Sequence, residues 1–133
     1  MSKEPYKISP GCVYNINYHF VWCPKYRKAV LVGEVKEDLE KLIKEKAREL
    51  EIEIVGMEIM PDHIHLFVSA KPTIAIHSII RQLKGYSSHF LREKYEHLRK
   101  KLPTLWSRSY YVGTAGFVSQ TVIQNYIAQQ KGK

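Results

Sequence analysis

Two histidines separated by a single residue, His63 and His65, are the side chains in this chain best suited to metal chemistry. They begin the segment 63–70, which is predicted to be a strand, and alternate residues of a strand share one face. Two imidazoles about 7 Å apart along a strand can converge on one divalent ion at bond lengths of about 2.0–2.2 Å. The same pattern also fits surface histidines on a half-exposed strand. The pair is therefore a candidate metal site that needs further support.

A second candidate group stands near the C-terminus, where Tyr126 and Gln130 are four residues apart and would be neighbours on a helix face. A tyrosine hydroxyl is a weak nucleophile at its usual pKa of about 10, but a nearby cation favours the phenolate or polarises a phosphate under attack. The amide oxygen of Gln130, which the helical spacing selects over Gln129, is a candidate third ligand. The alternative is a helix that packs Tyr126 into an apolar groove and leaves Gln130 in water.

The other four histidines are weaker candidates. His19 lies on a predicted strand of its own and can face the same way as the pair. His77, His89 and His97 fall within a helical pattern, have no evident partner, and are predicted to be solvated.

Seven segments are predicted to be regular, in the order β-α-β-β-α-β-α. The strands are 13–23, 52–60, 63–70 and 105–112, and the helices are 34–50, 73–100 (capped by Thr73) and about 118–131. The first six have the order of the ferredoxin-like (RRM-like) α+β fold, an antiparallel sheet with two helices on one face. The seventh is an added C-terminal helix that carries the tyrosine.

The alternation of the strand 63–70 indicates where this fold would place the histidines. Its aliphatic residues, among them Ile64 and Leu66, form the face that helices would cover. We therefore expect His63 and His65 on the open face. The chain 1–133 is predicted to be a single domain, with a core of about 11–112 and a glycine-flanked hinge at 113–116 before the last helix.

The charge of the chain is unevenly distributed. Its 133 residues include 21 Lys and Arg against 13 Asp and Glu, a formal net charge of +8. The segment 34–53 contains eight acidic and five basic residues, so nearly everything else is cationic. Such a surface attracts polyanions and favours nucleic acid or an acidic membrane surface as partner. A high pI that serves solubility alone is the alternative.

The composition favours a cytoplasmic globular protein. No stretch approaches the roughly 20 apolar residues of a membrane span, and the first residues have no signal-peptide character. Cys12 and Cys23 are predicted to lie on one strand, too far apart to bond to each other. Two cysteines form no disulfide framework, which favours a reducing compartment.

Several of these pieces together resemble one family. They are His19-Phe20-Val21-Trp22 with Pro24 to Arg27, Met60 to Val68 around His63-Ile64-His65, Leu83-Lys84-Gly85, Leu105-Trp106, Tyr110 to Gly116, and Tyr126-Ile127 with Gln130. On these residues nearly the whole chain resembles the single-tyrosine HUH transposases of small insertion sequences that move as single-stranded DNA. HUH denotes two histidines around a hydrophobic residue.

The resemblance implies a mechanism. Tyr126 would attack a phosphodiester of single-stranded DNA, giving a 5′-phosphotyrosine link and a free 3′-hydroxyl. His63, His65 and Gln130 would hold Mg²⁺ or Mn²⁺ against the scissile phosphate. The resemblance also implies a homodimer in which the tyrosine helix of one subunit completes the histidine site of the other, and recognition of hairpins near the ends of the element.

The basic residues give candidate DNA contacts, each of which is alternatively a solvated charge. They are Lys25, Arg27, Lys28, Arg81, Lys84, Arg92 and Arg108, with Tyr110 or Trp106 available for stacking. Trp106 is more typical of a core residue.

Two other functions remain open from the sequence. A non-catalytic nucleic-acid-binding module of the same fold would expose stacking aromatics on its open sheet face, where only Phe67 qualifies. A domesticated HUH protein would keep the site but process repeated genomic hairpins, and a replication initiator is disfavoured by the short chain. Hairpins beside the gene at both ends of an element would favour the transposase.

Overall fold

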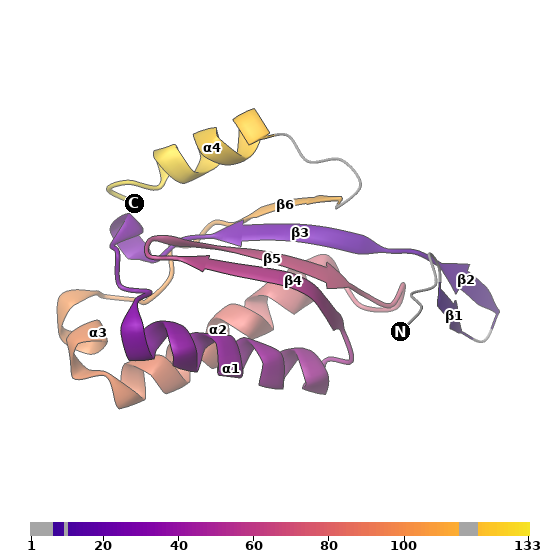
Figure 1. The fold of residues 1–133 in the computed structure, drawn as a ribbon, viewed down its shortest axis with the longest axis horizontal. Helices are drawn as coiled ribbons and strands as arrows, with labels where there is room; N and C mark the ends of the chain where they lie inside the picture. Colours follow the sequence, from indigo (N-terminus) through magenta and orange to yellow (C-terminus); the bar gives the residue numbers. More distant parts are fainter. Residues whose placement is uncertain (1–6, 10, 115–119) are drawn as a thin grey trace.

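The computed structural model describes residues 7–9, 11–114 and 120–133. Its centre is an antiparallel sheet with the strand order β4-β5-β3-β6. These strands are β3 (Asn17–Trp22), β4 (Glu53–Met60), β5 (His63–Ser69) and β6 (Tyr111–Thr114). The helices α1 (Gly33–Glu49) and α2 (Ile76–Lys94) cover one face, and α4 (Gln120–Gln129) lies over the other (Figure 1). The ferredoxin-like arrangement with an added C-terminal helix is confirmed.

The hydrophobic core lies between the sheet and the helices α1 and α2. β5 contributes Ile64, Leu66 and Val68, and β3 contributes Phe20 and Trp22, all fully buried. The helices bury residues at helical spacing, namely Val35, Leu39, Ile43 and Ala47 from α1, and Ile79, Ile80, Leu83, Ser87 and Leu91 from α2. Because side chains alternate along β5, its histidines are displayed on the opposite face, where α4 lies.

The first predicted strand, 13–23, is divided in two. β2 (Cys12–Tyr14) pairs with β1 (Lys7–Ser9) in a separate two-stranded sheet, and β3 begins only at Asn17. The Asn17 side-chain amide donates to the side chain of Asn15 at the break, a local bond that competes with strand pairing. The expectation that both cysteines share one strand was therefore wrong. Cys12 is on β2 and Cys23 follows β3, and both are free thiols.

The predicted helix 73–100 is also divided. α2 begins at Ile76 without a side-chain cap from Thr73, and α3 (Glu96–Lys101) follows after Tyr95, which has extended backbone. Leaving the helix lets the Tyr95 hydroxyl donate to Asp38 of α1 over 2.5 Å. No proline or glycine marks this break. α2 is amphipathic, and in the described ranges no helix combines the length and apolar character needed to cross a membrane.

The last strand is shorter and later than the predicted 105–112. The stretch before β6 is held by Pro24 and its neighbours rather than by the sheet, since the Lys25 amide donates to the Leu105 carbonyl and the Ser107 amide to the Cys23 carbonyl. Trp106 is buried there, as expected. The first half of the predicted hinge, 113–114, belongs to β6, and 115–116 lies outside the described residues.

Candidate active site

His63 and His65 lie side by side on the face of β5 that α1 and α2 leave uncovered. Their ring centroids are 5.0 Å apart, and the ring planes meet at 80°. Both side chains are half-buried, so the surrounding protein holds them while their outer edges stay accessible. This is the face and the proximity that the alternation of the sequence predicted.

Each of the two rings is held through its Nδ1 atom. His63 Nδ1 is 2.8 Å from Asp62 Oδ1, and His65 Nδ1 is 3.0 Å from Nε2 of His19. Histidines that bind metals commonly use one ring nitrogen for the ion and hold the other in such a bond, which fixes the orientation of the ring. The two Nε2 atoms make no hydrogen bond within the part of the chain that the structure describes. The donor set therefore fits a divalent cation.

His19 is the buried member of this group. It is 2% exposed, and its ring stacks on Phe67 with centroids 4.1 Å apart. Burial, and next the neighbouring His65, lower its pKa to about 4, so His19 is neutral at pH 7. A neutral His19 can accept the Nδ1 proton of His65, which leaves the Nε2 lone pair of His65 for a metal. His19 Nδ1 is then a buried donor with no partner among the described residues.

The charge state of His65 also suits a ligand. Burial lowers its pKa, and the neighbouring His63 lowers it further. A lowered pKa keeps the imidazole neutral at pH 7, the form in which histidine binds metals. The three remaining histidines are exposed, as expected, but the prediction that they lack partners was wrong. His77 contacts the Tyr110 hydroxyl, His89 pairs with Glu93, and His97 packs against Tyr95.

A third metal ligand is not supplied by the usual side chains. In the described ranges, no three His, Cys, Asp or Glu side chains converge as a metal site would require. Gln130, the candidate from the sequence, lies just beyond the end of α4 and is 5% exposed, so the alternative that leaves it in water was wrong. Its Oε1 accepts a hydrogen bond from Ser109 over 3.0 Å, and no hydrogen bond joins it to either histidine within the described residues.

Tyr126 belongs to the same hydrogen-bonded group. Its hydroxyl lies 3.0 Å from Ser109 Oγ. Because the single Ser109 proton is donated to the Gln130 oxygen, Tyr126 must donate its own proton to Ser109. Burial raises the pKa of the Tyr126 phenol above its usual range. In this arrangement Tyr126 is a protonated donor, so a reaction would require an added cation or base. The Ser107 hydroxyl donates to the same Gln130 oxygen over 3.4 Å. Ser107 and Ser109 were missed by the sequence analysis, which had no signal beyond their alternate spacing.

The tyrosine opens onto a cationic cavity of about 540 Å³. Its lining combines Lys25, Ser107, Arg108, Ser109, Tyr126, Gln129, Gln130 and Lys133. Three of these side chains are cations and none is a carboxylate. A cavity with this lining favours a phosphate group beside the tyrosine hydroxyl.

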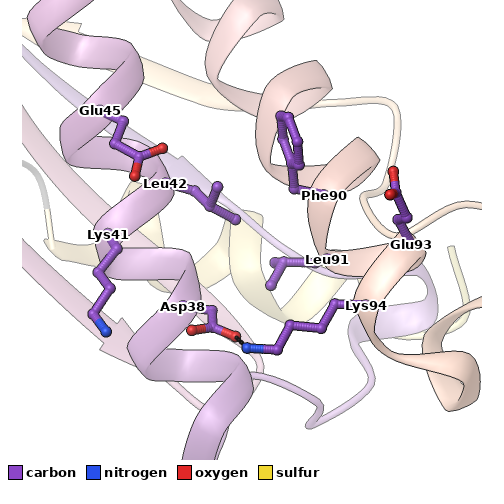
Figure 2. Close-up of a pocket in the computed structure, with 8 residues that line it drawn as sticks. All are labelled: Asp38, Lys41, Leu42, Glu45, Phe90, Leu91, Glu93 and Lys94. Carbon is purple, nitrogen blue, oxygen red and sulfur yellow. Dashed lines mark hydrogen bonds and ion pairs between the residues drawn. The ribbon is translucent and has the colours of Figure 1, made fainter.

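A groove on the opposite face of the molecule, which is formed by α1 and α2, differs in its charge. It lies between α1 and α2, has a volume of about 380 Å³, and contains the ion pair between Asp38 and Lys94 (Figure 2). Its other charged residues are Lys41, Glu45 and Glu93, so carboxylates outnumber cations. Polyanions are therefore favoured on the face that carries α4 rather than on the face formed by α1 and α2.

The seven basic residues proposed as DNA contacts fall into two groups. Lys25 and Arg108 line the tyrosine cavity, and Lys28 and Arg81 are exposed. The other three already bind protein groups: Arg27 the Asp62 carboxylate, Lys84 the carbonyls of Ser107 and Ser109, and Arg92 the carbonyls of Leu98 and Leu102. Tyr110 is partly buried against the core. In this structure the second group binds other parts of the protein and does not present free cations.

The pH dependence of stability tests the role of Lys84, which binds the carbonyls of Ser107 and Ser109. Burial lowers its pKa to about 8, below the 10.5 of an unfolded lysine. Between these values the unfolded chain binds the proton that the folded chain has lost, so the free energy of unfolding rises with pH in this window. We expect a rise of at most about 3 kcal/mol. In Lys84→Met this contribution should be absent, as measured by urea unfolding at pH 7.5 and 10. An equal rise in the variant would assign the effect to other groups.

Comparison with known proteins gives a consistent result. Residues 12–130 match the family described as "Transposase IS200 like". The "ISDra2 transposase TnpA" of Deinococcus radiodurans is 41% identical over 129 residues, covering 96% of this chain and 92% of that protein. The "Transposase for insertion sequence element IS200" of Salmonella typhimurium is 33% identical over 119 residues, covering 88% of this chain and 78% of that protein.

Two solved structures share the fold. A crystal structure of a transposase candidate from Deinococcus radiodurans superposes with a TM-score of 0.85 at 36% identity, covering 96% of this chain and 99% of that one. A REP-associated tyrosine transposase bound to a REP hairpin superposes with a TM-score of 0.57 at 14% identity, over 84% of this chain and 62% of that one. At that identity the second likeness concerns the fold alone.

Proposed function

The chain belongs to the family of IS200-like transposases, and from this premise we propose that it cuts and rejoins single-stranded DNA through Tyr126. The observation that carries the proposal is the pair His63 and His65, each held at Nδ1 by another side chain with its Nε2 edge free. The substrate would be the hairpin-bearing end of an insertion sequence, processed in the cytoplasm of a prokaryotic cell.

The proposed reaction is a transesterification. The bond between the Tyr126 oxygen and phosphorus forms while the bond from phosphorus to the 3′-oxygen breaks, and the tyrosine proton passes through solvent to the released 3′-hydroxyl. A bound Mg²⁺ or Mn²⁺ would offset the charge that develops on the phosphate. The 3′-hydroxyl of another strand can then attack the phosphotyrosine, which restores Tyr126 without ATP because the phosphoester bond is conserved.

The residues of this chain have separate parts in the proposal. His63 and His65 would hold the ion, and Asp62 and His19 orient their respective rings. Lys25, Arg108 and Lys133, which line the cavity, would surround a phosphate beside the tyrosine. Gln130 would serve as third ligand only after its oxygen leaves Ser109. Because Gln130 directly follows α4, a movement of that helix would carry Tyr126 and Gln130 together.

The packing of Phe67 argues against the non-catalytic alternative. That alternative depends on an aromatic side chain offered to bases on the open sheet face. The Phe67 ring instead stacks on His19, at an interplanar angle of 11°. One face of the ring is thus covered by the group that holds His65.

The proposal is tested directly by looking for the covalent intermediate. Labelled single-stranded DNA from both flanks of the gene is incubated with the protein and Mg²⁺ or Mn²⁺ and separated on a denaturing gel. We expect a protease-sensitive adduct that chelator prevents. Tight binding without adduct on either flank would contradict the proposed reaction and favour a binding module.

The proposed homodimer yields its own prediction. If Tyr126 acts on the histidine site of its partner, mixing Tyr126→Phe with His63→Ala subunits creates one intact site in each heterodimer. Random association then restores about a quarter of the wild-type cleavage, because half of the dimers are mixed and each has one intact site. The measurement is adduct yield after the two proteins are mixed. No recovery, with mixed dimers demonstrated by tag capture, would place each site within one chain.

A further inference from the structure

We propose that Arg27 is a positioning residue that couples the docking of α4 to the orientation of His63. The inference rests on the proposed function, because it assumes that His63 holds a metal ion. Its basis is a continuous set of contacts from the tyrosine helix to the histidine strand through one guanidinium group. Each contact in the set is formed by a different atom of Arg27 or of Asp62.

The first contact lies on the histidine side. Arg27 Nε is 3.2 Å from Asp62 Oδ2, while Oδ1 of the same carboxylate is 2.8 Å from His63 Nδ1. The side chains of Arg27, Asp62 and His63 are 25%, 30% and 16% exposed, so solvent screens these contacts only in part. Arg27 therefore fixes the carboxylate that fixes the His63 ring.

The second contact lies on the tyrosine side. Arg27 Nη1 donates to the carbonyl oxygen of Ile127 over 3.3 Å. Ile127 follows Tyr126 directly, in the last turn of α4, and its carbonyl also accepts a bond from the Gln130 amide over 3.1 Å. Carbonyls at this end of a helix carry partial negative charge. A guanidinium group is well suited to bind there. It therefore holds the turn of the helix that carries Tyr126.

The backbone around Arg27 is specialised for this placement. Tyr26 and Arg27 have φ values of 60° and 53°, the left-handed region that side chains other than glycine rarely adopt. The strained turn is held by hydrogen bonds from the Arg27 amide to the Pro24 carbonyl and from the Lys25 amide to the Leu105 carbonyl. Strain of this kind persists where the surroundings impose it, commonly at functional sites. From this turn the Arg27 side chain contacts both Asp62, which directly precedes β5, and Ile127 of α4.

These contacts make helix docking and metal binding mutually dependent. When α4 is docked, the Ile127 carbonyl restrains the guanidinium, and the restrained guanidinium restrains Asp62 and His63. When α4 leaves, Nη1 loses its acceptor and the His63 ring loses part of its support. Linkage requires the converse as well, so an ion bound by His63 stabilises the docked helix by the same factor. The tyrosine is thus held in place preferentially when the metal site is filled.

The test measures metal affinity and helix docking without DNA. The full-length protein, Arg27→Gln, Arg27→Lys and the charge-matched control Arg81→Gln are titrated with Mn²⁺, and amide hydrogen exchange of residues 121–129 is followed with and without Mn²⁺. We expect Arg27→Gln to weaken Mn²⁺ binding about 5-fold or more and to speed exchange in α4. Arg27→Lys, which keeps the charge without the planar fork, should fall between Arg27→Gln and wild type. Arg81→Gln should match wild type.

The outcomes separate the inference from the proposed function. In the wild type, Mn²⁺ should slow exchange in α4, and in Arg27→Gln it should not. If His65→Ala abolishes Mn²⁺ binding while both Arg27 variants bind and exchange like the wild type, the coupling is overturned and the metal site stands. If the wild-type protein binds no Mn²⁺, the coupling and the proposed metal chemistry fall together. The Arg27→Lys protein keeps the test valid should the glutamine variant fold poorly.

Discussion

Replacing Tyr126 with phenylalanine should reduce DNA cleavage by about 10⁴-fold or more, because the variant has no oxygen to form the bond to phosphorus. The loss should appear in the rate of adduct formation and in the rate of strand joining alike. Binding of hairpin DNA should stay close to wild type, since the change removes one atom from a cavity whose cations remain. Single-turnover cleavage and a binding titration on the same DNA measure the two quantities.

The Tyr126 result needs a control that separates the loss of the nucleophile from the loss of its support. Ser109→Ala removes the hydroxyl that accepts from Tyr126 and donates to Gln130, but leaves the phenol in place. We expect Ser109→Ala to retain adduct formation at an altered rate. Cleavage by Tyr126→Phe at the wild-type rate, with the protein still attached to DNA, would assign the nucleophile to another residue.

The fold was accessible from the sequence because its signals are local and repetitive. The alternation in β5 gave both the buried face at Ile64 and Leu66 and the position of the two histidines. The breaks within the predicted strands and helices could not be predicted in the same way. Tyr95 ends α2 because its hydroxyl reaches Asp38 on α1, a contact across 57 positions of sequence that no local pattern contains.

The candidate site, too, could be predicted only in part from the sequence. The types and spacing of His63, His65, Tyr126 and Gln130 identified the side chains that could take part in the chemistry. The residues that hold these side chains in place come from elsewhere in the sequence. Ser109 binds Gln130, and Arg27 binds Asp62 and the Ile127 carbonyl, through contacts that only the folded chain brings together.

The cationic residues could not be sorted from the sequence for the same reason. Lys84 and Lys25 are alike in type and in their basic surroundings. Burial and two backbone carbonyls make Lys84 a structural residue, whereas Lys25 lines the cavity beside Tyr126. A count of positive charges therefore predicts a polyanion partner but not the residues that contact it.

Removing the imidazole of His65 should reduce metal-dependent cleavage by about 100-fold or more, because one of two ring ligands is lost and several kcal/mol of charge stabilisation depend on the ion. His63→Ala should have a comparable effect. His89→Ala is a suitable control, since His89 is an exposed histidine of α2 that pairs only with Glu93 among its charged neighbours in the described structure. Cleavage rates across a Mn²⁺ titration provide the measurement.

The dependence on Mn²⁺ concentration decides what the loss means. If His65 is a ligand, His65→Ala should require more Mn²⁺ for half-maximal cleavage, whereas a merely structural histidine would lower the rate at every concentration alike. His19→Phe refines this distinction, because it keeps a ring to stack on Phe67 but cannot accept the Nδ1 proton of His65. Its half-maximal Mn²⁺ concentration should lie between those of the wild type and His65→Ala. Unchanged Mn²⁺ dependence in His65→Ala would exclude the histidine pair as the metal site, and the chemistry assigned to this face of the sheet would have to be carried by Tyr126 and its cationic cavity alone.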